Sequence, residues 1–298
     1  MQTDERRGLM LAICGFALLS VGDAVVKTMA GAWSPVAVAA LRFSIGAAGL
    51  CILLYRREGP AGFRPRNPLL QLARGFCVAG ATICFFSAIF VLPLATAMAL
   101  TFVAPIFVAL LSGPLLGEKV RPAVWLVSPA ALIGVVLILR PNLTTLGPVA
   151  LLPLGSALFF ALMVLANRAS AGQGSALSMQ AFIALGATPF LVAAAAIGHV
   201  SGAPMLAVGT PDWTVAARCA IVAVTASSAH WLVYLGTERA GAATIAPSTY
   251  VQMVVATVLG YLLFSDVPDA LTLAGAAIII GAGLVLWWRT PGSAPIDD

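Results

Sequence analysis

The chain has 298 residues, of which 61% are hydrophobic and only 9% are charged. Soluble domains are roughly 45–50% apolar and about 25% charged, so this composition excludes a water-soluble globular protein. It also excludes a disordered chain, which would be poor in apolar residues, and the mean hydropathy of +1.02 indicates a polytopic membrane protein.

The charged residues fall in short clusters, separated by apolar stretches close to the 20 or so residues that a spanning helix needs. We expect ten spanning helices, at about residues 8–29, 34–55, 70–91, 94–117, 122–140, 146–168, 177–199, 214–236, 241–264 and 267–289. The expected fold class is all-α integral membrane, because these runs are too long and continuous for the strands of a barrel. Such a chain leaves no room for a soluble catalytic or nucleic-acid-binding domain.

The first stretch follows Arg6 and Arg7 and could imitate a signal peptide. Because nine similar stretches follow it, a retained helix is the better interpretation. The five cysteines all fall inside expected helices without a CxxC spacing, which predicts apolar packing residues and neither disulfides nor a zinc site.

Lysine and arginine predict the orientation, since they accumulate in cytoplasmic loops. With a cytoplasmic N-terminus, the opposite loops carry only Arg140. The cytoplasmic segments then carry Arg6, Arg7, Arg56, Arg57, Arg64, Arg66, Lys119, Arg121, Arg168, Arg239 and Arg289. We therefore expect a multi-pass protein of the inner cell membrane with both termini in the cytoplasm.

The chain divides into two five-helix halves, residues 1–145 and 146–298. Sliding residues 95–115 onto 243–263 aligns several identical residues, and the next acidic residue of each half also corresponds. The aligned pairs include Thr101 with Thr249 and Glu118 with Asp266, and a four-residue shift aligns Arg74 with Arg218. Because five is odd, the second half must enter the membrane in the opposite orientation, which is the inverted repeat of many secondary transporters.

Residues 92–100 read LPLATAMAL, and Pro105 and the run Gly117-Glu118-Lys119 follow. Residues 238–244 (ERAGAAT) and Asp266 form a looser second copy. Over essentially the whole chain, this pattern resembles the drug/metabolite transporter superfamily in its EamA-type branch. The resemblance implies a transporter of small metabolites or drugs, with exporters of aromatic and other hydrophobic amino acids as the relatives first named.

Charged groups within a membrane are candidate functional residues by default. Asp23 is the only acid inside an expected span, Lys27 follows it by one turn, and Arg42 lies at a similar depth in the second helix. We expect these three to meet in the extracellular half. Two interpretations stay open: a polar gate or substrate-headgroup site, or a structural ion pair between the first two helices.

A second candidate group lies on the eighth and ninth expected spans and would line a central cavity, or else act as interhelical hydrogen-bonding glue. Its members are His230, Trp231, Tyr234, Ser248, Thr249, Tyr250 and Gln252. The first half adds Thr101, the repeat counterpart of Thr249, together with Phe86 and Phe102. His230 could carry a proton, because histidine titrates near neutrality, or serve only as a hydrogen-bonding group.

We find no Walker A, HExxH or GxSxG motif, so neither ATP-driven transport nor a known hydrolase site is supported. The expected function is export of small, moderately hydrophobic metabolites, amino acids and aromatic ones among them, by alternating access. The alternatives are an intramembrane enzyme, an exporter of drugs or other metabolites such as nucleosides, and a structural or sensing protein. We expect no enzyme activity, cofactor, metal or nucleic-acid partner, and a monomer in the lipid bilayer, with an oligomer left open.

Overall fold

The computed structural model describes residues 2–117 and 122–288, and these ranges contain helices and their connections without a strand. The α-helices are α1 (Gln2–Lys27), α2 (Pro35–Glu58), α3 (Pro68–Ile89), α4 (Leu94–Thr101), α5 (Ala104–Leu116), α6 (Pro122–Leu146), α7 (Leu152–Ala169), α8 (Ala176–Val200), α9 (Trp213–Ala240), α10 (Ala242–Ile245), α11 (Val251–Phe264) and α12 (Ala270–Trp288). Four short 3-10 turns join them: η1 (Gly59–Phe63), η2 (Gly147–Leu151), η3 (Pro204–Leu206) and η4 (Ala246–Tyr250).

The described residues contain eight helices long and apolar enough to cross a membrane. Two shorter apolar helices, Val127–Arg140 and Ala270–Val285, coincide with the fifth and tenth expected stretches. The expected all-α, multi-span membrane class is thereby confirmed.

Two of the expected stretches are broken near their middle. The fourth divides into α4 and α5 at Phe102–Val103. Pro105 explains the break, because it lacks an N–H and its ring would clash with the carbonyl of Thr101, the last residue of α4. The ninth divides into α10, η4 and α11, with Pro247 in the 3-10 turn.

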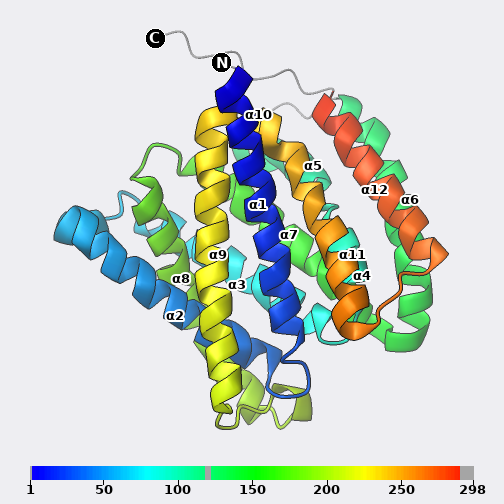
Figure 1. Cartoon of the computed structure of the whole chain (residues 1–298), viewed down its shortest axis with the longest axis horizontal. Helices are drawn as coiled ribbons and strands as arrows, with labels where there is room; N and C mark the ends of the chain where they lie inside the picture. The colour runs from blue at the N-terminus through cyan, green and yellow to red at the C-terminus, as the bar shows by residue number, and fades with distance from the viewer. Residues whose placement is uncertain (1, 118–121, 289–298) are drawn as a thin grey trace.

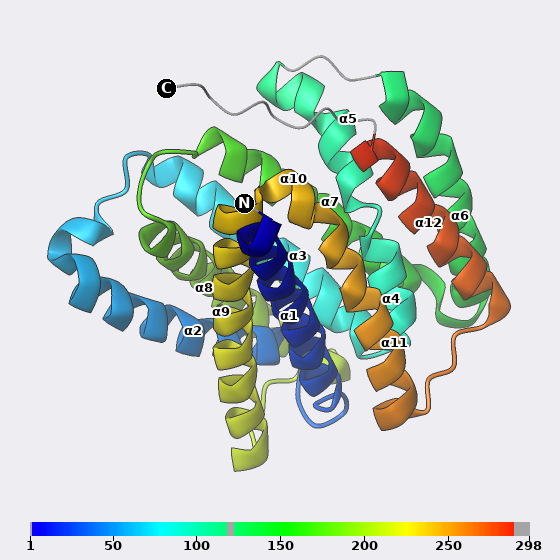
Figure 2. The same cartoon turned by 45° about the horizontal axis from the view of Figure 1, so that its top comes forward.

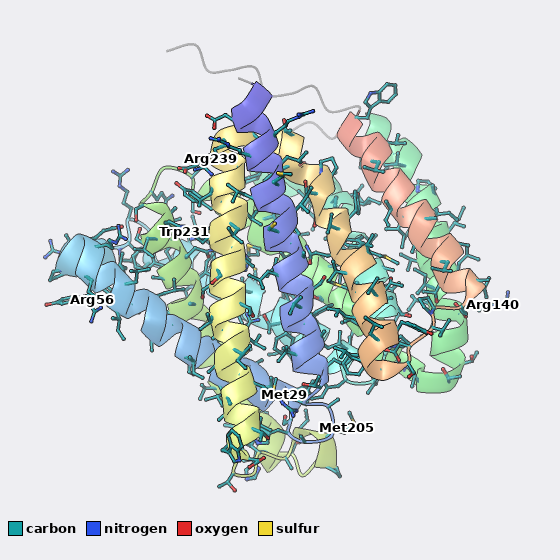
Figure 3. All side chains as sticks on the ribbon, in the orientation of Figure 1. Met29, Arg56, Arg140, Met205, Trp231 and Arg239 are labelled. Atoms are coloured by element: carbon teal, nitrogen blue, oxygen red, sulfur yellow. The ribbon has the colours of Figure 1, made fainter. Side chains whose placement is uncertain are left out.

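The helices pack in pairs that are distant in the sequence (Figure 1). α1 lies along α9, α3 contacts α7 and α8, α2 contacts α8, and α6 lies along α12. Figure 2 shows the α6–α12 pair on one flank and α2 on the opposite flank, with α1 and α9 between them. Figure 3 labels Arg239 near the end that carries the N-terminus, and Met29 and Met205 at the other end.

Several of these pairs approach through glycine, which permits close backbone contact in membranes. A Cβ placed on Gly75 of α3 would lie 2.3 Å from the carbonyl carbon of Gly186 on α8. A Cβ on Gly134 would lie 2.7 Å from the carbonyl oxygen of Gly275, where α6 meets α12. These contacts bring α3 against α8 and α6 against α12.

Candidate functional site

Three ionisable side chains meet in the interior: Asp23 on α1, Arg42 on α2 and His230 on α9. Arg42 interacts electrostatically with both of the others. Asp23 and Arg42 are partly buried and keep some accessible surface, and His230 is exposed. We call the partly accessible region that these three residues define the central chamber.

The structure thus brings Asp23 and Arg42 together, as their similar depth in the first two helices predicts. It adds His230, which the sequence assigned to a separate group on the eighth and ninth spans. The sequence signal for this addition was weak, since the depth of His230 was counted from the opposite end of its helix.

Aromatic rings hold the Arg42 guanidinium. Its central carbon lies 4.4 Å from the ring centroid of Phe43 and 5.3 Å from that of Phe86. Both distances fall within the range of cation–π attraction. Phe86 is only 2% exposed, so it packs beneath the guanidinium and does not present its ring to the chamber.

Lys27 lies outside this group, and the expected three-charge cluster is wrong for it. Its Nζ donates to Asp266 Oδ2 at 2.5 Å and to the carbonyl oxygen of Leu92 at 2.9 Å. The ammonium also lies 4.9 Å from the ring centroid of Phe264. Although Lys27 is one helical turn from Asp23, it is the last residue of α1, and its side chain reaches the loop that follows α11.

Sequence reasoning missed Asp266 as the partner of Lys27. Both residues fall at the same expected membrane face, which was the available signal. Two further hydrogen bonds involve the connection between α1 and α2: Trp33 Nε1 donates to the carbonyl of Gly209, and Arg218 Nη1 of α9 donates to the carbonyl of Thr28. We call the contacts of Lys27, Trp33 and Arg218 the outer closure.

The candidate residues of η4 and α11 form a hydrogen-bonded group beside α1. Gln252 Nε2 donates to Thr249 Oγ1 at 3.1 Å, and Ser20 Oγ donates to the carbonyl oxygen of Gln252 at 2.8 Å. Ser20 lies one turn before Asp23, so this group approaches the chamber from the α11 side. Ser248 is buried, with 6% of its surface exposed.

Phe102 and Tyr250 pack against each other at the two helix breaks. Their ring centroids are 5.3 Å apart and the rings are nearly perpendicular. The Tyr250 hydroxyl would lie 2.1 Å from a Cβ on Gly283, so it fills the notch that this glycine leaves on α12. Thr101 donates its hydroxyl to the Met98 carbonyl within α4.

Trp231 and Tyr234 lie toward the end of α9 that carries Arg239. They are 51% and 37% exposed, and their ring centroids are 5.9 Å apart. The Tyr234 hydroxyl donates to Glu238 Oε1. Trp231 and Tyr234 stand one and four residues from His230, on the part of α9 that leads from the chamber toward the end with the N-terminus.

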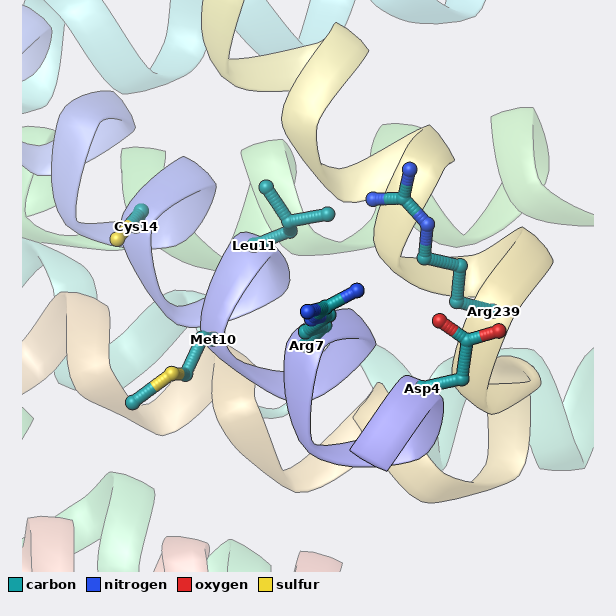
Figure 4. Close-up of a pocket in the computed structure, with 6 residues that line it drawn as sticks. All are labelled: Asp4, Arg7, Met10, Leu11, Cys14 and Arg239. Atoms are coloured by element: carbon teal, nitrogen blue, oxygen red, sulfur yellow. The ribbon is translucent and has the colours of Figure 1, made fainter. Parts of the chain in front are cut away.

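Figure 4 shows a surface pocket at that end, between α1 and α9. It is lined by Asp4, Arg7, Met10, Leu11, Cys14 and Arg239, and no residue of the two candidate groups contributes to it. Among the described residues, no group of three or more His, Cys, Asp or Glu side chains is arranged to hold a metal ion. Glu118, the counterpart of Asp266, lies outside the described residues.

The chain is similar to known membrane transporters. The EamA-like transporter family matches residues 6–140. The pseudopaline exporter CntI of Pseudomonas aeruginosa is 29% identical over 94% of this chain and 96% of its own length. An S-adenosylmethionine uptake transporter of Rickettsia prowazekii is 24% identical over 95% of this chain and 94% of its own, and a riboflavin transporter of Rhizobium johnstonii is 28% identical over 78% and 74%.

A crystal structure with 22% identity covers 95% of this chain and 99% of its own, with a TM-score of 0.63, which shows that the fold is shared. The named relatives are transporters and not enzymes, and their names include both export and uptake. The family match over residues 6–140, the helical membrane fold and these relatives together support an EamA-type transporter of the drug/metabolite transporter superfamily.

Proposed function

We propose that this protein exports small, moderately hydrophobic metabolites across the inner membrane, with amino acids, including aromatic ones, as its substrates. Transport proceeds by alternating access through the central chamber. One observation carries the proposal: Asp23, Arg42 and His230 lie within candidate membrane spans and keep accessible surface, while an ion pair and hydrogen bonds join the helices at one end. Intramembrane ionisable residues mark substrate pathways in membrane proteins.

The proposal includes an inverted repeat, residues 1–145 and 146–298, with the chamber between the halves. Three packing relations support it. If the halves are equivalent, the α1–α9 pair corresponds to the α3–α7 pair, and the structure contains both. The 148-residue shift that aligns Thr101 with Thr249 also aligns Phe102 with Tyr250, the two rings that touch at the helix breaks.

The third relation concerns the two arginines near the start of the third helix of each half. Arg74 of α3 donates to Asn167 near the end of α7, and Arg218 of α9 donates to the Thr28 carbonyl just past the end of α1. Each arginine therefore ties its helix to the end of the first helix of the other half. Broken helices at corresponding positions of two halves are the best pointer to a transporter binding site.

The arrangement fits a conformation that is closed outside and accessible from the cytoplasm. With the N-terminus in the cytoplasm, the outer closure seals the extracellular face. The exposed His230, Trp231 and Tyr234 then mark the route from the chamber to the cytoplasmic end. An exporter loads its substrate in this state.

We assign roles on this basis. Asp23, Arg42 and His230 contact the substrate in the chamber, and Thr249 and Gln252 support it with hydrogen bonds from the α11 side. Trp231 and Tyr234 receive apolar substrate parts on entry, while Ser248 and Thr101 keep the broken helices in register. Phe86, Phe102 and Tyr250 form the packed floor between the halves, and Lys27 acts as the outer gate.

Reconstituted protein tests the proposal. Proteoliposomes containing the full chain are assayed for uptake of a labelled panel of aromatic and aliphatic amino acids, nucleosides and riboflavin, with and without a pH gradient. We expect amino-acid flux above that of empty vesicles. Flux of only the nucleosides or riboflavin would replace the proposed substrate class, and flux that ignores the gradient would remove His230 and Asp23 as proton carriers.

A further inference from the structure

The two unlike charges of the central chamber are not paired with each other. Within the described residues, no ion pair joins Asp23 to Arg42, although the two lie close enough to interact electrostatically. Nor does either side chain make a hydrogen bond to another described residue. Buried charges are normally paired and hydrogen-bonded, so this arrangement needs an explanation.

The available hydrogen-bonding capacity is large. A guanidinium carries five N–H donors, and an ionised carboxylate has about four acceptor sites. The Arg42 guanidinium lies over the rings of Phe43 and Phe86, and its N–H donors make no hydrogen bond to another described residue. Both groups also retain accessible surface, so a solute in the chamber can reach them.

We propose that Asp23 and Arg42 form a binding site for the zwitterionic headgroup of a free α-amino acid, with Arg42 receiving the carboxylate and Asp23 the ammonium. This inference rests on the proposed function and names the part of the substrate that this site recognises. The pairing of Arg with a carboxylate is the geometrically favoured one, because two parallel N–H···O bonds form. The ammonium then satisfies Asp23 at the same time.

The charges favour a zwitterion over other solutes. A dianion such as a phosphate ester would gain from Arg42 but would be repelled by Asp23, and a dication would meet the opposite problem. A neutral solute would leave both charges without a partner, which is costly in a low-dielectric interior. A ligand with one charge of each sign satisfies both residues and leaves the chamber electrically unchanged.

The aromatic support orients the site. Because the Arg42 guanidinium already lies against the rings of Phe43 and Phe86, it is held in place before a ligand arrives, and less freedom is lost on binding. His230 also lies within electrostatic range of Arg42. The substrate side chain then points away from the two charges.

The test removes charged groups one at a time from the ligand and from the protein. Binding of L-phenylalanine, 3-phenylpropanoate (no ammonium) and 2-phenylethylamine (no carboxylate) is measured by competition on the purified full chain. Each deletion on the ligand should weaken binding roughly 10- to 100-fold, as for lost hydrogen bonds to charged groups. Asp23→Asn should weaken the binding of L-phenylalanine but not that of 3-phenylpropanoate. Arg42→Gln should weaken the binding of L-phenylalanine but not that of 2-phenylethylamine.

A control variant and two substitute variants accompany these measurements. Arg140→Gln removes an exposed arginine from α6 and should leave all three affinities unchanged. If a neutral variant does not fold, as judged by size-exclusion chromatography, Asp23→Glu and Arg42→Lys take its place, and the ligand series on the unmodified chain decides. Equal binding of L-phenylalanine and either analogue would overturn the headgroup site but leave the proposal of amino-acid transport intact. If L-phenylalanine does not bind and nucleosides or riboflavin are transported, both the headgroup site and the proposed amino-acid transport are overturned.

Discussion

Breaking the Lys27–Asp266 contact should open the face that the proposed orientation places outside the cell. Replacing Lys27 with methionine removes the ammonium but keeps a side chain of similar length. The change deletes the 2.5 Å ion pair and the 2.9 Å bond to the Leu92 carbonyl, and it leaves Asp266 without its partner. Since neither contact can persist once the gate opens, the closed state alone loses stability.

The structure sets the size of the effect. The two side chains are 11% and 21% exposed, so the pair lies between a surface pair and a buried one. Surface pairs contribute up to about 1 kcal/mol, and removing one partner of a buried pair costs about 3–5 kcal/mol. An intermediate value of about 2 kcal/mol changes the ratio of open to closed protein roughly 30-fold, because about 1.4 kcal/mol corresponds to a factor of ten.

A native cysteine reports the opening. Cys219 of α9 is 0% exposed, and its Sγ lies 3.9 Å from Met29 Sδ, near the outer closure. With the other four cysteines replaced by alanine, a membrane-impermeant thiol reagent is added to the outside of intact cells. Lys27→Met should accelerate labelling of Cys219 by up to about 30-fold, in proportion to the open fraction.

Two comparisons separate a gate from a general charge effect. Arg140→Met also removes a positive charge near the expected outer face and should leave the labelling rate unchanged. The double variant Lys27→Met/Asp266→Asn should label no faster than Lys27→Met alone, because both changes break the same pair. Unchanged labelling in Lys27→Met, or equal acceleration in Arg140→Met, would refute the gate.

Two further predictions concern helix packing. Gly75→Ala should destabilise the protein by about 1–3 kcal/mol and so lower its unfolding temperature in detergent. The new Cβ would lie 2.3 Å from Gly186, whereas ordinary contact begins near 3.4 Å. Gly46→Ala is the matched control and should not lower the unfolding temperature, because a Cβ at Gly46 meets nothing within 4 Å. Arg74→Met should cost about 2–4 kcal/mol, because this 4% exposed guanidinium loses charged hydrogen bonds, including the one to Asn167. In an Asn167→Leu background the same change should cost less, and equal costs would exclude the Arg74–Asn167 contact as a source of stability.

Hydropathy predicted most of the helices, because the bilayer imposes a length and an apolar composition on each of them. A helix must remain apolar for about 20 residues to cross a bilayer, so the expected stretches overlap the helices, with ends that differ by up to six residues. The breaks at Phe102–Val103 and at η4 lie inside apolar runs, and hydropathy does not register them. Pro105 and Pro247 were the available signals, since proline interrupts the backbone bonds of a helix.

The site was predictable where depth alone decides proximity. Asp23 and Arg42 lie at similar depths on consecutive helices, and they lie within electrostatic range of each other. Lys27 shows the limit: spacing along α1 favoured Asp23, whereas the packing of α1 against α11 brought Asp266 within reach. Contacts between helices that are far apart in the chain depend on the whole arrangement, and no local pattern carries that information.

Alternating access through one chamber is the central claim, and substrate counterflow tests it most directly. Proteoliposomes containing the full chain are loaded with excess unlabelled L-phenylalanine and diluted into buffer with a trace of the labelled compound. A carrier exchanges the two, so labelled L-phenylalanine should rise transiently above its equilibrium level and be recovered chemically unchanged. Labelled substrate that only approaches equilibrium would indicate a channel, recovery of an altered compound would indicate an enzyme, and either result would contradict the account.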